Sequence, residues 1–260
     1  MWLESCPKTS FHSINNNQFE CALSLRLFLP QKTIIPFSMC SCSTENTPIT
    51  LDPQGLHLCS GCYHDNVKNI IHNNLRDSII YTLNHLGLQT VREPPNQFRA
   101  VNPDDGCRPD IKVLGLSDRP LLLDVTVTSP VPPNNPHSLS FSDAKIPLRQ
   151  SKRRHLDKIK DYGHKSTLSN MDFLPIVFES TGNLHPDAVN LFVRVINRYC
   201  RDKNAPFEPV WRFWISLIGI SFQKSIAECI LNRSYKINSH QQPTNTEFDD
   251  DKVHDFCYRR

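Results

Sequence analysis

The chain has 260 residues, of which 38% are hydrophobic and 21% are charged, with 20 prolines and a formal net charge of +3. This length exceeds what one small core needs but is short for two full-sized domains, so we expect one main domain with appendages. The small net charge does not by itself imply a nucleic-acid partner. The first residues lack the basic start and apolar run of a secretory signal, which predicts an intracellular protein.

The N-terminal part combines a short helix with a loop rich in metal-ligating residues. Apolar side chains within residues 18–29 predict the helix, which ends at a proline. Two closely spaced pairs follow, Cys40 with Cys42 and His57 with Cys62. Zinc prefers four thiolate or imidazole ligands in a tetrahedron, and two such pairs separated by a loop can supply them.

Other assignments of these cysteines stay open at this level. Cys59 could replace His57 as the fourth ligand, and without metal the same residues would be ordinary thiols in a proline-rich loop. Four protein ligands leave no position for a substrate. We therefore expect a structural zinc that orders a segment with little core of its own.

The next segment is an amphipathic helix. Apolar residues within 67–86 recur at steps of three and four, and Gly87 closes the helix. The opposite face carries His72, Asn73, Arg76 and Asp77, and polar residues on one face of a helix are usually solvated. We expect the same for these four.

The remaining sequence predicts alternating strands and helices. Four segments predict strands, at 89–93, 111–114, 121–127 and 173–178, of which the first is short and ends before two prolines. Helices are expected at 142–162 with a break at Pro147, at 187–199, and at 208–231 as one long or two shorter helices. From Ser234 onward the chain is polar and without period, which predicts a disordered tail. The alternation predicts an α/β fold with a small mixed sheet flanked by helices.

The longest apolar run does not predict a membrane protein. It extends from Val210 to Phe222, contains Arg212, and is too short to cross about 30 Å of hydrocarbon. We expect a buried helix and no membrane partner.

Two aspartates stand out chemically. Arg108-Pro109-Asp110 is followed after thirteen residues by Asp124, which lies within the apolar strand predicted at 121–127. An ionised carboxylate there is costly unless a metal or a cation compensates it. Two carboxylates on neighbouring strands can hold Mg²⁺ or Mn²⁺ against a phosphate. Asp124 could instead cap a turn or pair with an arginine.

Cations are concentrated between residues 143 and 165, a segment that contains eight lysines and arginines but only three aspartates. Such a basic helix after an acidic strand would suit binding of a phosphate backbone. The candidate phosphate-binding residues are Arg108 from the preceding loop and Arg149, Lys152, Arg153, Arg154 and Lys160. The alternative is a solvated charged helix.

These features together resemble the C-terminal portion of non-long-terminal-repeat retrotransposon polyproteins. There, a CCHC-type zinc motif precedes a restriction-enzyme-like endonuclease domain of the PD-(D/E)xK superfamily. The matching motifs are Cys40-x-Cys42 with His57-x4-Cys62, the helix with His72, Asn73, Leu75, Arg76 and Asp77, Glu93-Pro94, and Arg108-Pro109-Asp110 with Asp124. Residues 19–30 are similar to the segment that links the reverse transcriptase to this zinc motif. The likeness covers about residues 15–200 and includes no polymerase, which implies a fragment, a decayed copy or a domesticated remnant.

The resemblance implies a reaction, its partners and its location. Asp110 and Asp124, with the carbonyl of Val125, would hold Mg²⁺ or Mn²⁺ for nicking one DNA strand and exposing a 3′ hydroxyl for target-primed reverse transcription. DNA, and element RNA as a further partner, would be bound in the nucleus, with no small-molecule substrate. The superfamily places a lysine two residues after the second acid, where Thr126 stands here, and Lys158 could supply that ammonium instead. Glu93 could be a further catalytic acid, or a turn residue.

Three functions therefore compete: an active endonuclease, an inactive nucleic-acid-binding remnant, and a protein-interaction domain that uses the apolar residues Trp211, Phe213 and Trp214. The predicted organisation is a helical linker remnant at 1–36, a zinc motif at 37–65, a restriction-endonuclease-like core at 66–200, a helical extension at 201–233 and a disordered tail at 234–260.

Overall fold

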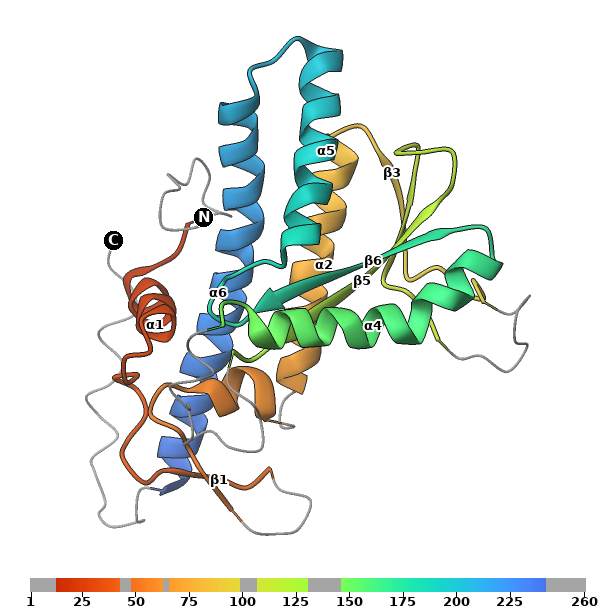
Figure 1. The fold of residues 1–260 in the computed structure, drawn as a ribbon. Helices are drawn as coiled ribbons and strands as arrows, with labels where there is room; N and C mark the ends of the chain where they lie inside the picture. The colour runs from red at the N-terminus through yellow and green to blue at the C-terminus, as the bar shows by residue number, and fades with distance from the viewer. Residues whose placement is uncertain (1–12, 43–47, 63–65, 99–106, 131–145, 242–260) are drawn as a thin grey trace, which may run out of the picture.

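A four-stranded mixed sheet is the centre of the protein. The computed structural model describes residues 13–42, 48–62, 66–98, 107–130 and 146–241 (Figure 1). In the sheet order β3-β4-β5-β6, the first two pairs are antiparallel and the last is parallel. The strands are β3 (Gln89–Arg92), β4 (Ile111–Leu114), β5 (Leu121–Thr128) and β6 (Asp172–Glu179). All four expected strands are present.

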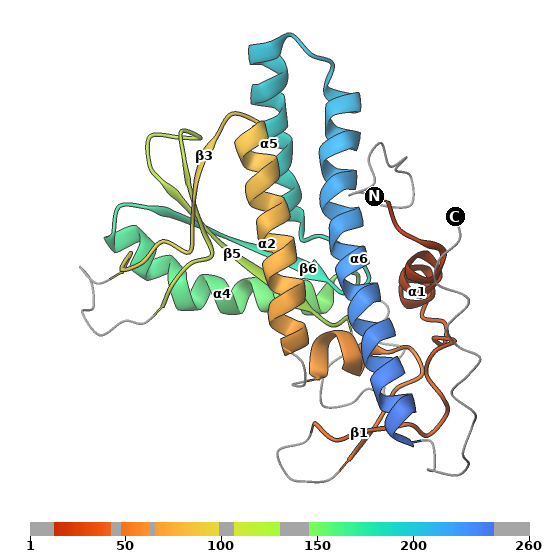
Figure 2. The ribbon, with the colours of Figure 1, turned by 180° about the vertical axis from the view of Figure 1, so that it is seen from behind.

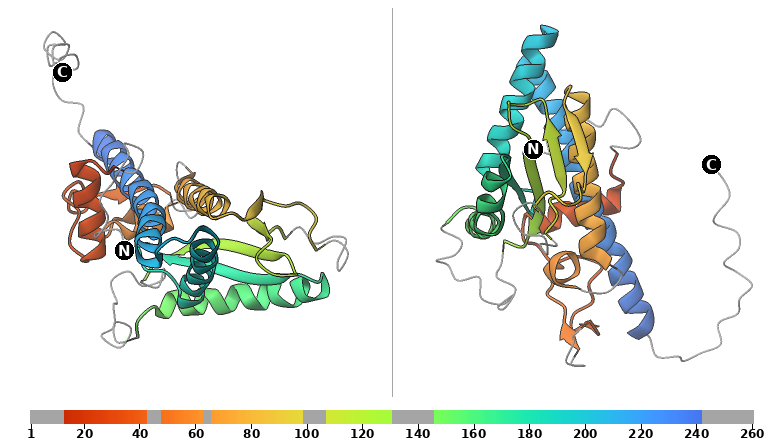
Figure 3. Two further views of the ribbon diagram at one scale, coloured as in Figure 1. Left: turned by 90° about the horizontal axis from the view of Figure 1, so that it is seen from above. Right: turned by 90° about the vertical axis from the view of Figure 1, so that its right-hand side faces the viewer.

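Helices cover both faces of this sheet. Figure 3 shows α2 (Val67–His85) and α4 (Arg149–Leu168) on opposite faces. Because β5 and β6 are parallel, the chain needs a crossover between them, and α4 is that crossover. The fold is therefore α/β with a small mixed sheet flanked by helices, as expected from the sequence.

The alternation of side chains along β5 places Asp124. Leu121, Leu123 and Val125 belong to the main core, while Leu122 belongs to a smaller cluster with Phe98 and Met171. Successive side chains of a strand point to opposite faces, so Asp124 shares the face of Leu122. That face is the one covered by α4.

The helix α6 (Phe207–Gln241) is single and longer than expected, and it crosses the whole protein (Figure 2). It contacts α1 (Asn16–Arg26), α2, α5 (Pro186–Lys203) and the short π-helix η3 (His57–Gly61). By length and composition it could cross a membrane, but 72% of its most apolar window is buried inside the protein, and core helices pass the same test.

The prediction of a disordered tail from Ser234 onward was wrong for residues 234–241, which are helical. Ser234 and Ile237 are buried, and the Asn238 side chain donates to the carbonyl of Thr33 at 3.0 Å. Packing on the N-terminal loop thus stabilises a helix that polar composition alone did not indicate. Residues 242–260 lie outside the described part of the chain.

The helix predicted at 142–162 is also shifted. In the structure α4 begins at Arg149, just after Pro147, and continues to Leu168. Residues 142–145 lie outside the described part of the chain.

The segment with the cysteine cluster is not set apart from the rest. It contains β1 (Met39–Cys40) and β2 (Ile49–Thr50), which pair antiparallel. Its buried residues, including Leu51 and Leu58, join the same continuous core as α2 and α6. This segment therefore has more core around it than the sequence suggested.

Candidate functional site

The carboxylate of Asp110 lies between two strands and a helix. Asp110 immediately precedes β4, and its backbone N–H donates to the carbonyl of Leu123 at 3.0 Å. Its Oδ2 accepts the backbone N–H of Val125 at 2.6 Å and lies 3.2 Å from Nε2 of His72 on α2. The bond to Val125, the residue after Asp124, joins the two aspartates across the β4–β5 pair.

Asp124 is paired with Lys158 on α4. The lysine Nζ lies 2.9 Å from Oδ2 and 3.1 Å from Oδ1 of the carboxylate. The side chains of Asp124 and Lys158 are only 6% and 15% exposed, so the pair is shielded from water. The compensating cation that a buried Asp124 requires is therefore a lysine from the crossover helix, and not an arginine.

Burial and neighbouring charge act in opposite directions on these groups. Burial raises the pKa of Asp124, and nearby Asp110 raises it further, while Lys158 works against both. The pKa of His72 is raised because its ring donates to Asp110, although burial opposes this.

Thr126 takes part in the same arrangement. Its hydroxyl donates to Oδ2 of Asp124 at 3.1 Å, as expected for residues two apart on one face of a strand. The Lys158 ammonium also lies 5.3 Å from the centre of the Tyr162 ring. An ammonium from α4 therefore lies on the face of β5 that Asp124 and Thr126 share.

Glu93 lies beside the aspartates but has arginine partners. Its backbone N–H donates to the carbonyl of Asp110 at 2.8 Å. Its carboxylate forms ion pairs with Arg76 and with Arg108, the latter at 2.9 Å. We call Asp110 and Asp124 together the acidic site. Arg108 thus lies next to this site, and two arginines flank the Glu93 carboxylate.

The solvated helix face expected at residues 72–77 was wrong in part. Arg76 is 1% exposed, and its Nε donates to Asp77 at 3.0 Å in addition to the Glu93 pair. His72 is directed at Asp110. Helical periodicity gave no indication of this, because it cannot show that a sheet edge approaches the polar face; only the resemblance included these two residues among its motifs.

The other cations predicted to bind phosphate lie along α4. Arg149, Lys152, Arg153, Arg154 and Lys160 are exposed, whereas Lys158 is largely buried against Asp124. The helix therefore directs Lys158 toward Asp124 and half-buries Lys165, whose Nζ lies 3.4 Å from the Cys107 sulfur, while these five cations are exposed. Within the exposed set, we call the consecutive residues Lys152, Arg153 and Arg154 the basic triplet.

The cysteine cluster has the ligand geometry expected of a metal site. Donor atoms of Cys40, Cys42, His57 and Cys62 all lie within 4.8 Å of one another. The Sγ atoms of Cys40 and Cys62 are 3.7 Å apart, and Sγ of Cys42 is 3.2 Å from Nε2 of His57. Three thiols and an imidazole are a donor set that suits zinc. The cluster could hold a structural metal such as zinc.

The alternative ligand Cys59 does not belong to this cluster. It is buried, its thiol is directed at the carbonyl of Leu56 at 3.4 Å, and burial raises the pKa of its thiol. His57 is presented by η3, whose start is fixed by Asp52. The Asp52 carboxylate accepts the backbone N–H groups of Leu56 and His57, each at 2.7 Å.

A cation from α6 completes the surroundings of the cluster. Arg233 lies 3.6 Å from the Cys40 sulfur. Burial opposes ionisation of Cys40, but hydrogen bonds from Arg233 and from Cys42 and Cys62 outweigh it and lower the pKa of the thiol. A thiol that ionises more readily is a better metal ligand.

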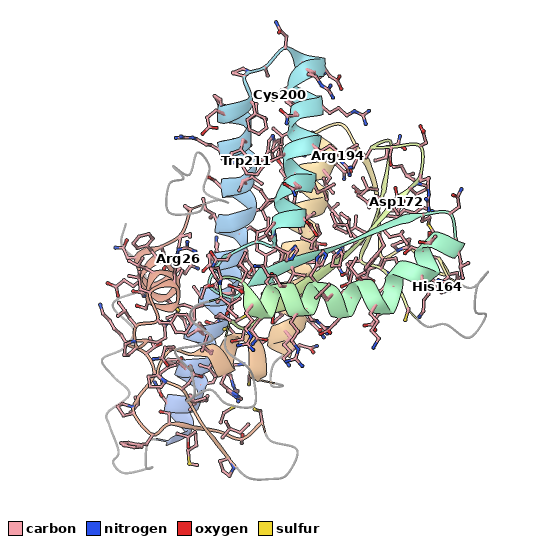
Figure 4. All side chains as sticks on the ribbon, viewed as in Figure 1. Arg26, His164, Asp172, Arg194, Cys200 and Trp211 are labelled. Carbon is pink, nitrogen blue, oxygen red and sulfur yellow. The ribbon has the colours of Figure 1, made fainter. Side chains whose placement is uncertain are left out.

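The aromatic residues Trp211, Phe213 and Trp214 on α6 differ in their exposure. Trp214 is 9% exposed and packs near Tyr81 and His85 of α2. Trp211, labelled in Figure 4, stacks on Phe207 with ring centres 5.8 Å apart, whereas Phe213 is 43% exposed. Trp214 therefore belongs to the core, Trp211 is partly buried and Phe213 is exposed.

No family model and no curated protein sequence matches this chain.

Proposed function

We propose that this chain is a metal-dependent DNA endonuclease domain with a restriction-endonuclease-like core. The observation that supports this most directly is that Asp110, just before β4, lies beside Asp124 on β5, with a lysine against the second carboxylate. Oxygen ligands from two aspartates and a nearby ammonium are the components that phosphodiester hydrolysis requires. In particular, we propose a retroelement-derived domain that nicks one strand for target-primed reverse transcription.

The donor set at this site fits a hard divalent cation. Asp110, Asp124 and the backbone carbonyl of Val125 would hold Mg²⁺ or Mn²⁺. When bound, such an ion polarises the scissile phosphate and lowers the pKa of a bound water. His72 fixes the orientation of Asp110 from α2, and Val125 fixes it from β5. Asp110 is thereby held from both sides.

Lys158 would have two roles at this site. It compensates the buried charge of Asp124, so the protein can fold with that carboxylate ionised. It also places an ammonium beside the metal-binding oxygens, where a water or a phosphate oxygen would lie. The same helix directs the basic triplet outward, where it would contact the DNA backbone.

The first test is nicking of supercoiled plasmid in Mg²⁺ or Mn²⁺. Wild-type protein should convert the plasmid to the open circle, while Asp110→Asn and Asp124→Asn should not, with DNA binding retained. Asp157→Asn is the matched control, because Asp157 is an exposed acid on α4. Absence of nicking by the wild type, with salt-sensitive DNA binding kept, would instead support an inactive nucleic-acid-binding remnant.

The role of Lys158 can be separated from its effect on folding. Lys158→Met should abolish nicking, and adding Thr126→Lys should restore part of it, since residue 126 shares the face of Asp124. Rescue would show that the ammonium is needed near Asp124 whichever element supplies it. A Lys158→Met protein that nicks as well as wild type would refute this role.

A further inference from the structure

A second group of metal-ligating side chains lies where α4 meets the start of α5. His155 on α4, His185 at the cap of α5 and Asp187 in the first turn of α5 have donor atoms within 4.8 Å of one another. Nε2 of His155 is 3.2 Å from Oδ2 of Asp187, and Nδ1 of His185 is 3.9 Å from the same oxygen. None of these residues takes part in the acidic site or in the cysteine cluster.

The two imidazole rings are buried and stacked. His155 and His185 are each 7% exposed, and their rings are 4.0 Å apart at an angle of 9°. Nδ1 of His155 is buried without a hydrogen-bond partner among the described residues. This atom does not face Asp187; an ion would bind His155 through Nε2, which does, and would leave the ring proton on Nδ1. Because a metal lies in the plane of each imidazole that binds it, the two rings would turn out of their parallel stack to share one ion.

We propose that His155, His185 and Asp187 bind one divalent transition-metal ion of the zinc class, at a site independent of the other two. Two imidazoles and a carboxylate form a ligand set that zinc uses where it keeps an open position. Asp187 is 51% exposed, so the open position would face solvent. The ion would join α4, which carries Lys158 and the basic triplet, to the connection that follows β6.

Without metal, the same contacts have a smaller role. Nδ1 of His185 accepts the backbone N–H of Asp187 at 3.3 Å, which caps α5. Asp187 also contributes a negative charge to the first turn of that helix, where it is favourable. The experiment must therefore distinguish metal binding from capping alone.

The test is to count zinc equivalents bound by the full chain after equilibration with excess zinc and removal of free ion. We expect two for the wild type, one at the cysteine cluster and one at the histidine site. His155→Gln and Asp187→Asn should each weaken the second equivalent by more than about tenfold. The matched control His164→Gln, an exposed histidine near the other end of α4, should keep both (Figure 4).

Cobalt distinguishes the two sites by colour. Co²⁺ at the cysteine cluster gives thiolate charge-transfer absorption, whereas Co²⁺ at the histidine site gives only weaker ligand-field bands. Asp187→Asn should remove the second contribution and leave the first unchanged. A wild type that binds one equivalent, all of it with thiolate absorption, would overturn the proposal and leave a capping pair only.

The melting temperature gives a second measure of zinc binding that also shows whether each variant is folded. Added zinc should raise the Tm of a chain whose cysteine cluster is already loaded, because binding to the native state stabilises it by mass action. The Tm of Asp187→Asn should show no such rise. The same rise in Asp187→Asn as in the wild type would also overturn the proposal.

Discussion

The cysteine cluster and the acidic site differ in how their ligands are neutralised. In the cluster, thiols and an imidazole face one another, and the cation seen beside them is Arg233. In the acidic site, each carboxylate already has a nitrogen partner, His72 for Asp110 and Lys158 for Asp124. If the proposed metals bind, we therefore expect the cluster to keep its ion permanently and the acidic site, whose carboxylates are compensated without one, to exchange its ion. That is the difference expected between a structural and a catalytic metal.

The largest effect should come from removing a ligand of the cluster. Cys62→Ala should lose one zinc equivalent and lower the free energy of unfolding by about 4 kcal/mol or more, as loss of a structural metal does. Elemental analysis and urea unfolding measure the two quantities. Cys59→Ala is the control, because this buried cysteine lies in the same loop but outside the cluster. Equal zinc content and stability in both variants would contradict a structural metal here.

The next effect concerns the buried ion pair. Lys158→Met leaves the carboxylate of Asp124 without its cation and should cost about 2–4 kcal/mol. Lys160→Met, an exposed lysine on the same helix, should cost almost nothing. Adding Asp124→Asn to Lys158→Met should recover most of the loss. Chemical unfolding of the four proteins tests this, and equal costs at both lysines would show that the pair contributes little.

A smaller effect is expected on DNA affinity. Replacing the basic triplet by glutamines should lower affinity about tenfold at moderate salt and reduce the salt slope by about 0.9 for each phosphate that the variant no longer neutralises. The charge-matched control replaces Arg194, Arg201 and Lys203 of α5, all exposed, by glutamines. Salt titrations of binding to a short duplex measure both. The same slope in both triple variants would mean that α4 is not the DNA-facing helix.

The smallest effect should appear at Glu179, where the carboxylate is buried at the end of β6. Burial raises its pKa, although Asn183 and the backbone N–H of Ser151 oppose this. The folded protein therefore binds this proton more tightly than the unfolded chain, and stability is lost as pH rises through the raised pKa. Glu179→Gln removes that dependence and should gain stability relative to wild type as pH increases. Exposed Glu208→Gln is the control in thermal melts across pH, and parallel curves for all three proteins would contradict the prediction.

Local patterns in the sequence predicted the helices and strands well. These elements depend on the spacing of apolar residues and on residues such as glycine and proline that end them. The apolar run at 121–127 became a strand buried along most of its length, and Gly87 follows α2 with φ of 83°, a conformation that suits glycine. The four cluster ligands also come together as their spacing predicts. These features depend on residues close in sequence.

Side-chain contacts between elements that are distant in sequence could not be predicted in the same way. The contact of His72 with Asp110 depends on how α2 crosses the sheet edge, and the pairing of His155 with Asp187 depends on where α5 begins. No periodic signal encodes either contact. Helix formation beyond Ser234 likewise depends on packing with the loop at Thr33, which overrides a polar composition.

The continuity of α6 has a consequence for how the protein opens. The helix bonds to α1 through Gln18 and Glu228 at 2.8 Å, to α2 through Ser78 and Ser221 at 2.7 Å, and reaches the cysteine cluster through Arg233. Elements that share one helix in this way tend to open together as a cooperative unit. Backbone amides near Trp214 and near Cys229 should therefore exchange their hydrogens at the same slow rate, and stripping metal from the cluster should accelerate exchange at both ends of the helix.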